Sequence, residues 1–587
     1  MSDFKKIYSL DPRISQAKPI VEVSKGASSI SSQTFQYLTA SNNQHVVSII
    51  IPSLQTVVDR YLLLQTTFRV QFKVTAPSNP SSVFPLSQGS IFGLASWPYH
   101  RLISSTTCSI NDSSVTTNYS QCLQSLLRVI DDKEWRQTAT TPSMLDKTAL
   151  CSTLGTTSTG GSGYTLSTAN PYSDANSLLD GSVPNGSFKI TYLDSTGDVL
   201  NGSGAYDYNG VSTNFVNGVP VSSTTQTGFW VFAEVTVTEP YMQSPFVFSK
   251  QSLDYSTGLS GITAIQITSQ MQSPAAANII KQLNPSYTIS NLDYFVAPSA
   301  SSAFSNSFAA LNFLTPQLSV FLPKTNIVPF QEIITYPFSS QQAIPAGSTA
   351  VVRSNTVTLN QIPEYLIVQI KPQSYSPVDG DWLLPVQSAS ITFDNITGIQ
   401  ANATQQQLYR MSYENGSKMS WNEWSGQANL STAAGAIQTV GGPLVLKFGK
   451  DIQLFSGLAP SVNGNFSLQV SCNVANYYND AVTPQITLIV VSTGVFTSEG
   501  GRSSRTTMLV TEKDVLEPTD GEIEDGSIST MIGVGKKRVY GKPKHQKGSG
   551  SMAGSGVSSG AGEMQISGRG KVSSSGSKHH TIVARYM

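Results

Sequence analysis

Residues 60–74 read RYLLLQTTFRVQFKV and predict a β-strand that is buried on one face. The apolar residues Phe68, Val70, Phe72 and Val74 alternate with polar or charged residues. A period of two places successive side chains on opposite faces of a sheet, so the alternation indicates a half-buried strand. Much of the chain repeats this pattern, which therefore decides the fold class.

Short strand-like runs recur along the chain. In the first half they include HVVSIII (45–51), FKITYLD (188–194) and FWVFAEVTVT (229–238). In the second half they are ITAIQIT (262–268), LSVFL (318–322), EIITYPF (332–338), STAVVRSNTVTL (348–359), YLIVQIK (365–371), SASITFD (388–394), LVLKFGKDIQLF (444–455), FSLQVSCNV (466–474) and ITLIVVSTGVF (486–496). Dense short strands with hardly any helix are typical of sandwiches and jelly rolls. We predict a mainly β protein: a double jelly roll of two eight-stranded antiparallel β-sandwiches, with long loop insertions and a few short helices.

The composition agrees with a folded β protein. Charged residues make up 12% of the chain and hydrophobic residues 39%. The opening MSDFKKIYSL lacks the apolar region of a secretory signal, and no run of about eighteen apolar residues occurs, so we expect no membrane span. Cys108, Cys122, Cys151 and Cys472 form no CxxC pair, which argues against a zinc ribbon or a redox motif. We expect all four to be free thiols.

Composition shifts divide the chain into segments. We expect an N-terminal arm at 1–30, a first jelly roll at 31–255 with a surface insertion at about 105–225, a second jelly roll at 256–500, an acidic linker at 501–530 and a basic, Gly/Ser-rich flexible tail at 531–587. Within the insertion, QCLQSLLRVIDD (121–132) predicts a helix with an apolar face. That face consists of Leu123, Leu126, Leu127 and Ile130.

The sequence offers few groups for catalysis. Three of its five histidines, His545, His579 and His580, lie in the tail. The chain contains no HExxH or GxxxxGK motif. We therefore expect a protein that is not an enzyme and that needs no metal or cofactor.

Residues 408–424 read LYRMSYENGSKMSWNEW and admit two interpretations. Glu414 and Glu423 could act as the paired carboxylates of a glycosidase, which lie about 5–9 Å apart around a sugar. In the other interpretation, residues 404–414 form a short helix that packs on a sheet. We favour the packing role, with six side chains as structural anchors. The anchors are Leu408, Tyr409, Met411, Tyr413, Trp421 and Trp424.

The ends of this helix can also be predicted. Asn402 or Thr404 is the expected N-cap, and Gly416 lies just past the end. Arg410 and Glu414 are four residues apart and should pair on the exposed side.

Eight segments along the chain carry a family resemblance. They are GASSISSQTF (26–35), TPSMLD (141–146), SITFDNITGIQ (390–400), LYRMSYENG (408–416), SWNEW (420–424), LVLKFGKDIQL (444–454), NGNFSLQVSCNVAN (463–476) and GVFTSEGGRSSR (494–505). In this order they resemble the major capsid proteins of polinton-like viruses, virophages and related adenovirus-like elements, over most of residues 20–510. The resemblance implies a double jelly roll. Three such chains form a pseudo-hexameric capsomer, and capsomers tile the icosahedral shell of a double-stranded DNA virus.

The resemblance also implies partners and a location. The chain would form a homotrimer, contact neighbouring capsomers, penton and minor capsid proteins, and reside in the virion after assembly in the host nucleus or cytoplasm. The tail departs from the family pattern, because residues 531–587 contain ten Lys or Arg and one acidic residue. A cluster in it is a candidate for binding genome phosphates or for nuclear import. The cluster is Lys536, Lys537, Arg538, Lys542, Lys544 and Lys547.

Three pentapeptides of the tail resemble the cleavage pattern of adenovirus-type maturation proteases. They are MIGVG (531–535), MAGSG (552–556) and ISGRG (566–570). LNGSG (200–204), in an expected loop, fits as well, so chance matches in glycine-rich sequence and a plain solvated tail are the alternatives. The candidate maturation sites are Gly533, Gly535, Gly554, Gly556, Gly568 and Gly570.

A second function class uses the same composition. A β-rich fibre or spike could bind glycans through exposed aromatic side chains, and a minor capsid protein is a further alternative that commonly needs only one jelly roll. The burial of Trp421 and Trp424 discriminates between these classes. A capsid scaffold buries both side chains, whereas a glycan-binding protein exposes them in a shallow groove.

Overall fold

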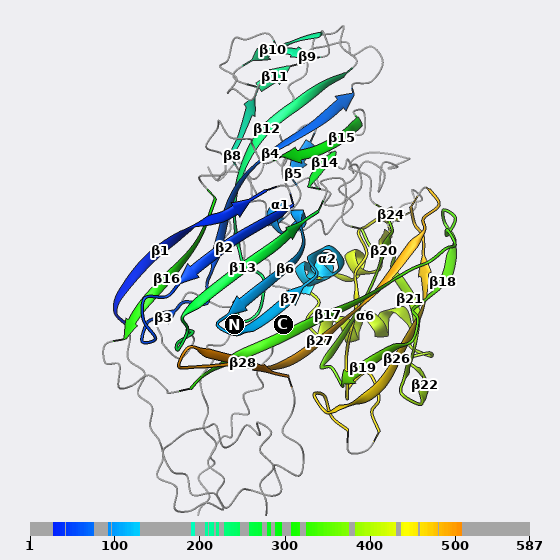
Figure 1. Cartoon of the computed structure of the whole chain (residues 1–587). Helices are drawn as coiled ribbons and strands as arrows, with labels where there is room; N and C mark the ends of the chain where they lie inside the picture. Colours follow the sequence, from blue (N-terminus) through cyan, green and yellow to red (C-terminus); the bar gives the residue numbers. More distant parts are fainter. Residues whose placement is uncertain are drawn as a thin grey trace, which may run out of the picture.

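The computed structural model of the chain contains two β-sandwiches that lie side by side (Figure 1). The structure describes residues 27–41, 43–75, 92–94, 97–129, 189–193, 206–208, 211–216, 219–221, 228–246, 258–272, 279–282, 288–295, 307–316, 325–374, 382–429, 436–455, 458–478 and 480–507. Within these ranges, no helix has the length and apolar character needed to cross a bilayer.

The second sandwich is formed by two packed sheets. Its elements are β17 (Asn326–Ser339), β18 (Thr349–Arg353), β19 (Val357–Gln361), β20 (Tyr365–Pro372), β21 (Val386–Phe393), β22 (Ile396–Ile399), α6 (Gln405–Glu414), α7 (Trp421–Trp424), β23 (Gln427–Asn429), β24 (Ala436–Gln438), β25 (Leu444–Lys447), β26 (Asn463–Ala475), β27 (Pro484–Glu499) and β28 (Arg502–Thr506). The strand orders are β17-β27-β20-β25, with β28 beside β27, and β18-β26-β21-β22, with β19 beside β26; β23 and β24 form a separate pair.

The first sandwich precedes it in the chain. Its elements are β1 (Ala27–Ala40), β2 (Gln44–Ile50), β3 (Val57–Val58), β4 (Leu63–Thr75), β5 (Phe92–Leu94), α1 (Pro98–Leu102), β6 (Ile103–Ile110), β7 (Ser113–Thr117), α2 (Tyr119–Val129), β8 (Lys189–Leu193), β9 (Tyr206–Tyr208), β10 (Val211–Val216), β11 (Val219–Val221), β12 (Gly228–Pro240), β13 (Ala264–Met271), β14 (Ile280–Gln282), β15 (Thr288–Phe295) and β16 (Phe308–Pro316). The strands follow one another in the order β7-β6-β13-β2-β1-β16-β4-β12-β8, with β15 beside β4 and β3 beside β16.

Strand β1 belongs to both sheets of the first sandwich. Up to Gln36 it pairs with β16, and from Tyr37 onward it pairs with β2. Dividing the strand path at β1 gives β7-β6-β13-β2 and β1-β16-β4-β12, which matches the order of the second sandwich strand for strand. The two halves are therefore copies of one jelly-roll topology, and the predicted double jelly roll is confirmed.

The expected boundary at residue 256 is corrected by strand pairing. β13 pairs with β2 and β6, and β16 pairs with β1, so that Gln33 lies opposite Leu311. Strands from β13 to β16 thus complete the first sandwich. The second sandwich begins between Pro316 and Asn326, because the last strands of a jelly roll lie beside its first.

Three further segment limits also change. The expected insertion at 105–225 overlaps β6, β7 and α2, whose side chains contribute to the core, so residues 105–129 are part of the sandwich. The predicted helix at 121–132 is confirmed as α2, although Ile130 lies outside the described residues. β1 already begins within the expected arm at 1–30, and β28 pairs with β27 within the expected linker at 501–530.

Beyond the sandwich sheets, β9, β10 and β11 form a small sheet of their own, and β5 pairs with β14. Figure 1 shows this small sheet at the end of the molecule furthest from the second sandwich.

Hydrophobic packing joins the two sandwiches. Strand β20 reads YLIVQIKP and is buried on both faces. Leu366 and Val368 face the core between the two sheets of the second sandwich, whereas Tyr365 and Ile367 pack into the core that includes the first sandwich. Cys108, Cys122 and Cys472 are buried free thiols, as predicted, and Cys151 lies outside the described residues.

Candidate functional site

Helix α6 is the framework of the segment that contained the two candidate carboxylates. Thr404 is its N-cap: the Thr404 hydroxyl accepts from Gln407 N at 3.3 Å, and Thr404 N donates to Gln407 Oε1 at 2.8 Å. This reciprocal pair satisfies two backbone donors that a helix start leaves without partners. After Glu414 the chain leaves the helix, and Gly416 adopts a φ of 110° that favours glycine.

Buried polar side chains tie α6 to β25 and to the turn after it. The Ser412 hydroxyl donates to Leu408 O at 2.9 Å and accepts from Val445 N at 3.1 Å. The Asn415 amide donates to Val445 O at 3.0 Å and to Asp451 Oδ2 at 2.6 Å. These bonds fix the position of α6 on the sandwich more narrowly than apolar contact alone, because hydrogen bonds are directional.

The tryptophans of α7 form an aromatic cluster with α6. Trp424 is fully buried, and its indole N–H donates to Pro443 O at 2.8 Å. The ring centroids of Tyr409 and Trp421 lie 5.4 Å apart and those of Tyr409 and Trp424 lie 5.7 Å apart. A Cβ at Gly442 would collide with the Trp424 ring, so glycine there leaves room for the indole.

The structure places five of the six expected anchors in or against the core and one outside it. Leu408 and Trp424 are buried, while Tyr409, Met411 and Trp421 are partly buried against the core of the second sandwich. Tyr413 is 62% exposed, which corrects its expected anchoring role. Its ring centroid lies 6.3 Å from that of Tyr409, which itself packs against Trp421 and Trp424, so Tyr413 lies at the exposed margin of the aromatic cluster.

Both carboxylates of the glycosidase hypothesis have structural partners. Glu414 binds Arg410 at 2.8 Å, as predicted, and Lys450 at 3.0 Å. Hydrogen bonds from Lys450 and Arg410 hold the pKa of the Glu414 carboxyl below its ordinary value, the opposite of what a general acid needs. Glu423 accepts from Ser420 N at 2.7 Å in the capping box of α7. The arrangement supports packing and gives no support to glycoside hydrolysis.

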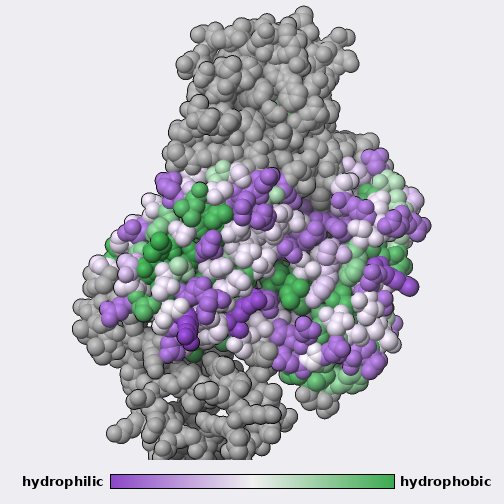
Figure 2. Space-filling model, viewed as in Figure 1, coloured by the Kyte–Doolittle hydropathy of each residue, from purple (hydrophilic) through white to green (hydrophobic). Residues whose placement is uncertain are grey.

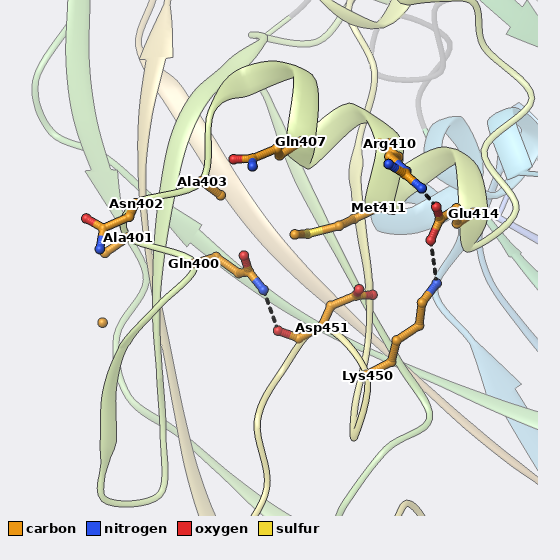
Figure 3. A pocket seen from close by; sticks show the side chains of 11 residues that line it. Gln400, Ala401, Asn402, Ala403, Gln407, Arg410, Met411, Glu414, Lys450 and Asp451 are labelled. Carbon is orange, nitrogen blue, oxygen red and sulfur yellow. Dashed lines mark hydrogen bonds and ion pairs between the residues drawn. The ribbon is translucent and has the colours of Figure 1, made fainter.

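A shallow depression lies beside α6, and Figure 3 shows the side chains that line it. One wall is α6 itself, with Gln407 and Met411. The opposite wall is the turn with Lys450 and Asp451, and Gln400 donates to Asp451 O at 2.6 Å across the floor. Sequence reasoning missed this depression, because its walls are about forty residues apart and meet only through the pairing of β25.

A second polar cluster is buried in the first sandwich, next to α1. Glu239 Oε1 accepts from Tyr99 N at 2.9 Å. Glu239 Oε2 accepts from His100 N at 3.0 Å and contacts His100 Nδ1 at 2.6 Å. His45 Nδ1 lies 3.1 Å from the Tyr99 hydroxyl, and burial lowers the pKa of His45 to about 4. Among the described residues, no group of three or more His, Cys, Asp or Glu is placed to hold a metal ion.

The basic cluster at 536–547 and the candidate maturation sites at 533–570 lie outside the described residues. They stay predictions.

Two family models match successive parts of the chain. Residues 2–314 match the model described as the Sputnik virophage major capsid protein 1st domain, and residues 330–494 match the major capsid protein V20 C-terminal domain. The first match covers more than half of the chain. The gap between the two matches falls where the structure passes from β16 to β17, which agrees with the corrected domain boundary.

Comparisons with individual proteins agree with the two family models. The putative capsid protein V20 of Sputnik virophage is 27% identical over 220 residues, which are 35% of this chain and 37% of that protein, well under half its length. The cryo-EM structure of the Sputnik virophage matches with a TM-score of 0.66 at 22% identity, over 90% of this chain and 98% of that chain. The crystal structure of the mavirus major capsid protein matches with a TM-score of 0.61 at 14% identity, over 88% and 98%. At these identities the structural matches show a shared fold.

Proposed function

This chain belongs to the Sputnik virophage major capsid protein family, and on that premise we propose that it builds the icosahedral shell of a virion. Three copies form a capsomer, and each copy contributes two sandwiches, so the capsomer is pseudo-hexameric. The observation that carries this proposal is the repeated strand order of the two sandwiches in one chain. Two like sandwiches per chain allow a ring of three chains, closed by one repeated heterologous contact, to present six similar units.

The proposal extends to partners of the finished shell. Capsomers contact one another as well as penton and minor capsid proteins. The basic tail binds genome phosphates without sequence preference, and a maturation protease cleaves it. The charge of residues 531–587 and the three pentapeptides within them support this extension.

The glycan-binding alternative has less support. Trp424 is fully buried and Trp421 is partly buried, so the two indoles do not form an exposed platform. A fibre or spike would use such a platform to stack on sugar rings.

The test is assembly of the full chain expressed alone. Light scattering should give the mass of three chains, and negative-stain images should show hexagonal particles or shells. A chain that stays monomeric at high concentration, or that forms elongated fibres, would contradict the capsid proposal. Mass spectrometry of the same sample, before and after incubation with an adenovirus-type protease, tests cleavage after the three pentapeptides.

A further inference from the structure

One sheet of each sandwich carries hydroxyl and amide side chains on its outward face. In the first sandwich this sheet contains β6 and β13, and the equivalent strands of the second sandwich are β21 and β26. Their inward side chains, such as Cys108 and Ile267 or Ile391 and Val470, are buried in the two cores. Because side chains alternate along a strand, the residues between them lie on the outward face.

Strand pairing arranges these outward residues in the same pattern twice. The first grid consists of the pairs Ser105–Gln270, Thr107–Thr268 and Ser109–Gln266 on β6 and β13. The second grid consists of the pairs Ser388–Asn473, Ser390–Ser471 and Thr392–Gln469 on β21 and β26. In both grids one strand carries only Ser or Thr, and its partner carries an amide, a hydroxyl and an amide in the same order. The two sandwiches thus present matching polar surfaces at equivalent places.

Neither grid contains a charged or an apolar residue, and every member is half-buried or exposed. Arg353, opposite Ser471 on β18, lies outside the second grid at the edge of the sheet. Figure 2 shows mainly pale and purple side chains over β6 and β13, while hydrophobic side chains gather over β1 and β2. The first grid therefore lies on an open polar surface of the molecule.

The chemistry of the grids makes each of them complementary to a copy of itself. Among the described residues, two grid side chains form a hydrogen bond within the chain: Thr107 contacts the Thr116 hydroxyl at 2.9 Å, and Gln469 donates to Ser354 O at 3.4 Å. A hydroxyl or an amide both donates and accepts hydrogen bonds, so each kind of group can bind its own kind. A grid with one sign of charge would instead repel its copy.

The contact between the two sandwiches shows which way the grids face in a capsomer. Helix α2, which follows β7 at the edge of the first sandwich, packs against β20 and β27 of the second, and the Ser125 hydroxyl donates to Gln369 Oε1 at 2.5 Å. In the proposed pseudo-hexamer this edge-to-face contact recurs from each sandwich to the next. A closed ring of six such contacts turns the covered sheets toward its axis. The opposite sheets, which carry the grids, then face outward.

We propose that the first and second grids are equivalent docking surfaces through which neighbouring capsomers contact one another, grid to grid. The partner is a second copy of this chain in another trimer, and the contacts are uncharged hydrogen bonds, direct or through water. Because the two grids have the same chemistry, either can face either, so a trimer presents six interchangeable sides. The inference rests on the proposed capsid function and assigns the surface that joins its capsomers.

Charge substitutions at the grid centres test the assignment. A full-length chain with Thr107→Lys and Ser390→Lys places like charges opposite one another wherever two grids meet. We expect this variant to form trimers but to give about tenfold fewer shells than the unchanged chain, because like charges repel across a contact. The matched control carries Gln55→Lys and Gln342→Lys, which add the same charge in exposed loops outside the grids, and should form shells normally. Light scattering and particle counts in negative stain measure both variants.

Cross-linking identifies the partner directly and does not depend on how the lysine variant folds. A full-length chain carries Thr107→Cys and Ser390→Cys, with Cys151→Ser, and the three buried native cysteines should not react with a short bismaleimide. In shells we expect covalent links between chains of different trimers, and in isolated trimers we expect none. A control with Gln55→Cys and Gln342→Cys should give far fewer links in shells.

Three results would overturn the grid assignment and leave the trimeric capsomer in place. The first is a normal yield of shells from the double-lysine variant, which would free the grids for another partner such as a minor capsid protein. The second is shells of the cysteine variant without links between trimers. The third is trimers of the unchanged chain that never associate with one another. If the unchanged chain forms no trimer, the capsid function fails as well.

Discussion

The two sandwiches share one strand order but differ in what they bury. Most buried ionisable side chains of the described residues belong to the first sandwich and its helices: His45, Asp59, Arg60, His100, Arg101, Arg128 and Glu239. The second sandwich buries Asp451. Its core is otherwise aliphatic and aromatic, with a few neutral polar groups that are hydrogen-bonded, such as Ser412 and Asn415.

The two sandwiches show that one strand order can be built with two chemically different cores. A jelly roll requires alternating side chains and correct strand neighbours, and both kinds of core meet that requirement. The pH dependence of stability should differ between the two cores, however. Apolar packing depends weakly on pH, whereas buried ionisable groups link folding to proton binding. The first sandwich should therefore be the acid-sensitive half of the molecule.

The largest expected effect is in the apolar core of the second sandwich. Trp424→Ala removes a fully buried indole and the hydrogen bond to Pro443 O, and should lower the free energy of unfolding of the second sandwich by about 3–5 kcal/mol. Urea unfolding followed by far-UV circular dichroism measures the change without relying on tryptophan emission. Trp421→Ala is the matched control and should lower the free energy of unfolding clearly less, because the Trp421 side chain is only partly buried.

The loss of unfolding free energy caused by Trp424→Ala should be the same at pH 7 and at pH 5.5. A loss that changes strongly between these values would show that the second core contains a titrating group, and would remove the contrast between the two sandwiches.

Local patterns in the sequence were enough to predict the fold class. The period-two runs marked strands such as β4 and β20, and apolar spacing marked α2 and α6 as helices. The domain boundary could not be predicted in the same way. β16 has the same alternation as any other strand, and only its pairing with β1, about 280 positions away in the chain, assigns it to the first sandwich.

The candidate site shows the same limit. The cap at Thr404 and the pair Arg410–Glu414 follow from spacing within one helix, and both were predicted. Lys450 and Asp451 reach α6 only because β25 is paired with β20. Tyr413 was misassigned because aromatic spacing alone does not show which side of a helix faces the sheet.

The next prediction concerns the buried polar cluster of the first sandwich. Glu239→Gln replaces one carboxylate oxygen by an amide NH2 group, which donates hydrogen bonds but cannot accept them. This NH2 group lies opposite either Tyr99 N or the two nitrogens of His100, N and Nδ1, and cannot accept their hydrogen bonds. We expect a loss of about 2–3 kcal/mol in the first sandwich, since a buried donor is left without a partner. Glu332→Gln, at the partly exposed pair with Arg505, is the control and should change thermal unfolding little. Equal effects of the two variants would mean that the buried cluster contributes no more than a surface pair.

The smallest expected effect is a pH dependence from His45. Burial lowers its pKa from 6.5 to about 4, so the folded chain keeps this imidazole neutral while the unfolded chain protonates it. Below pH 6.5 the unfolded state therefore binds more protons, and stability falls as the pH drops towards 4. From pH 7 to pH 5 the loss from this group is about 2 kcal/mol. Asp59 acts in the opposite direction, because burial raises its pKa to about 6 and favours the protonated folded form as the pH falls.

His45→Gln isolates the histidine contribution from that of Asp59. The variant should be less stable at pH 7, because it replaces the ring that contacts Tyr99, but its stability should fall less steeply between pH 7 and pH 5. Thermal unfolding of both proteins across this pH range measures the two slopes, and Asp59 contributes equally to each. Parallel slopes would show that His45 is not the source of acid sensitivity. The two cores would then differ in their buried polar contacts, such as the one between Glu239 and His100, but His45 would give them no difference in acid sensitivity.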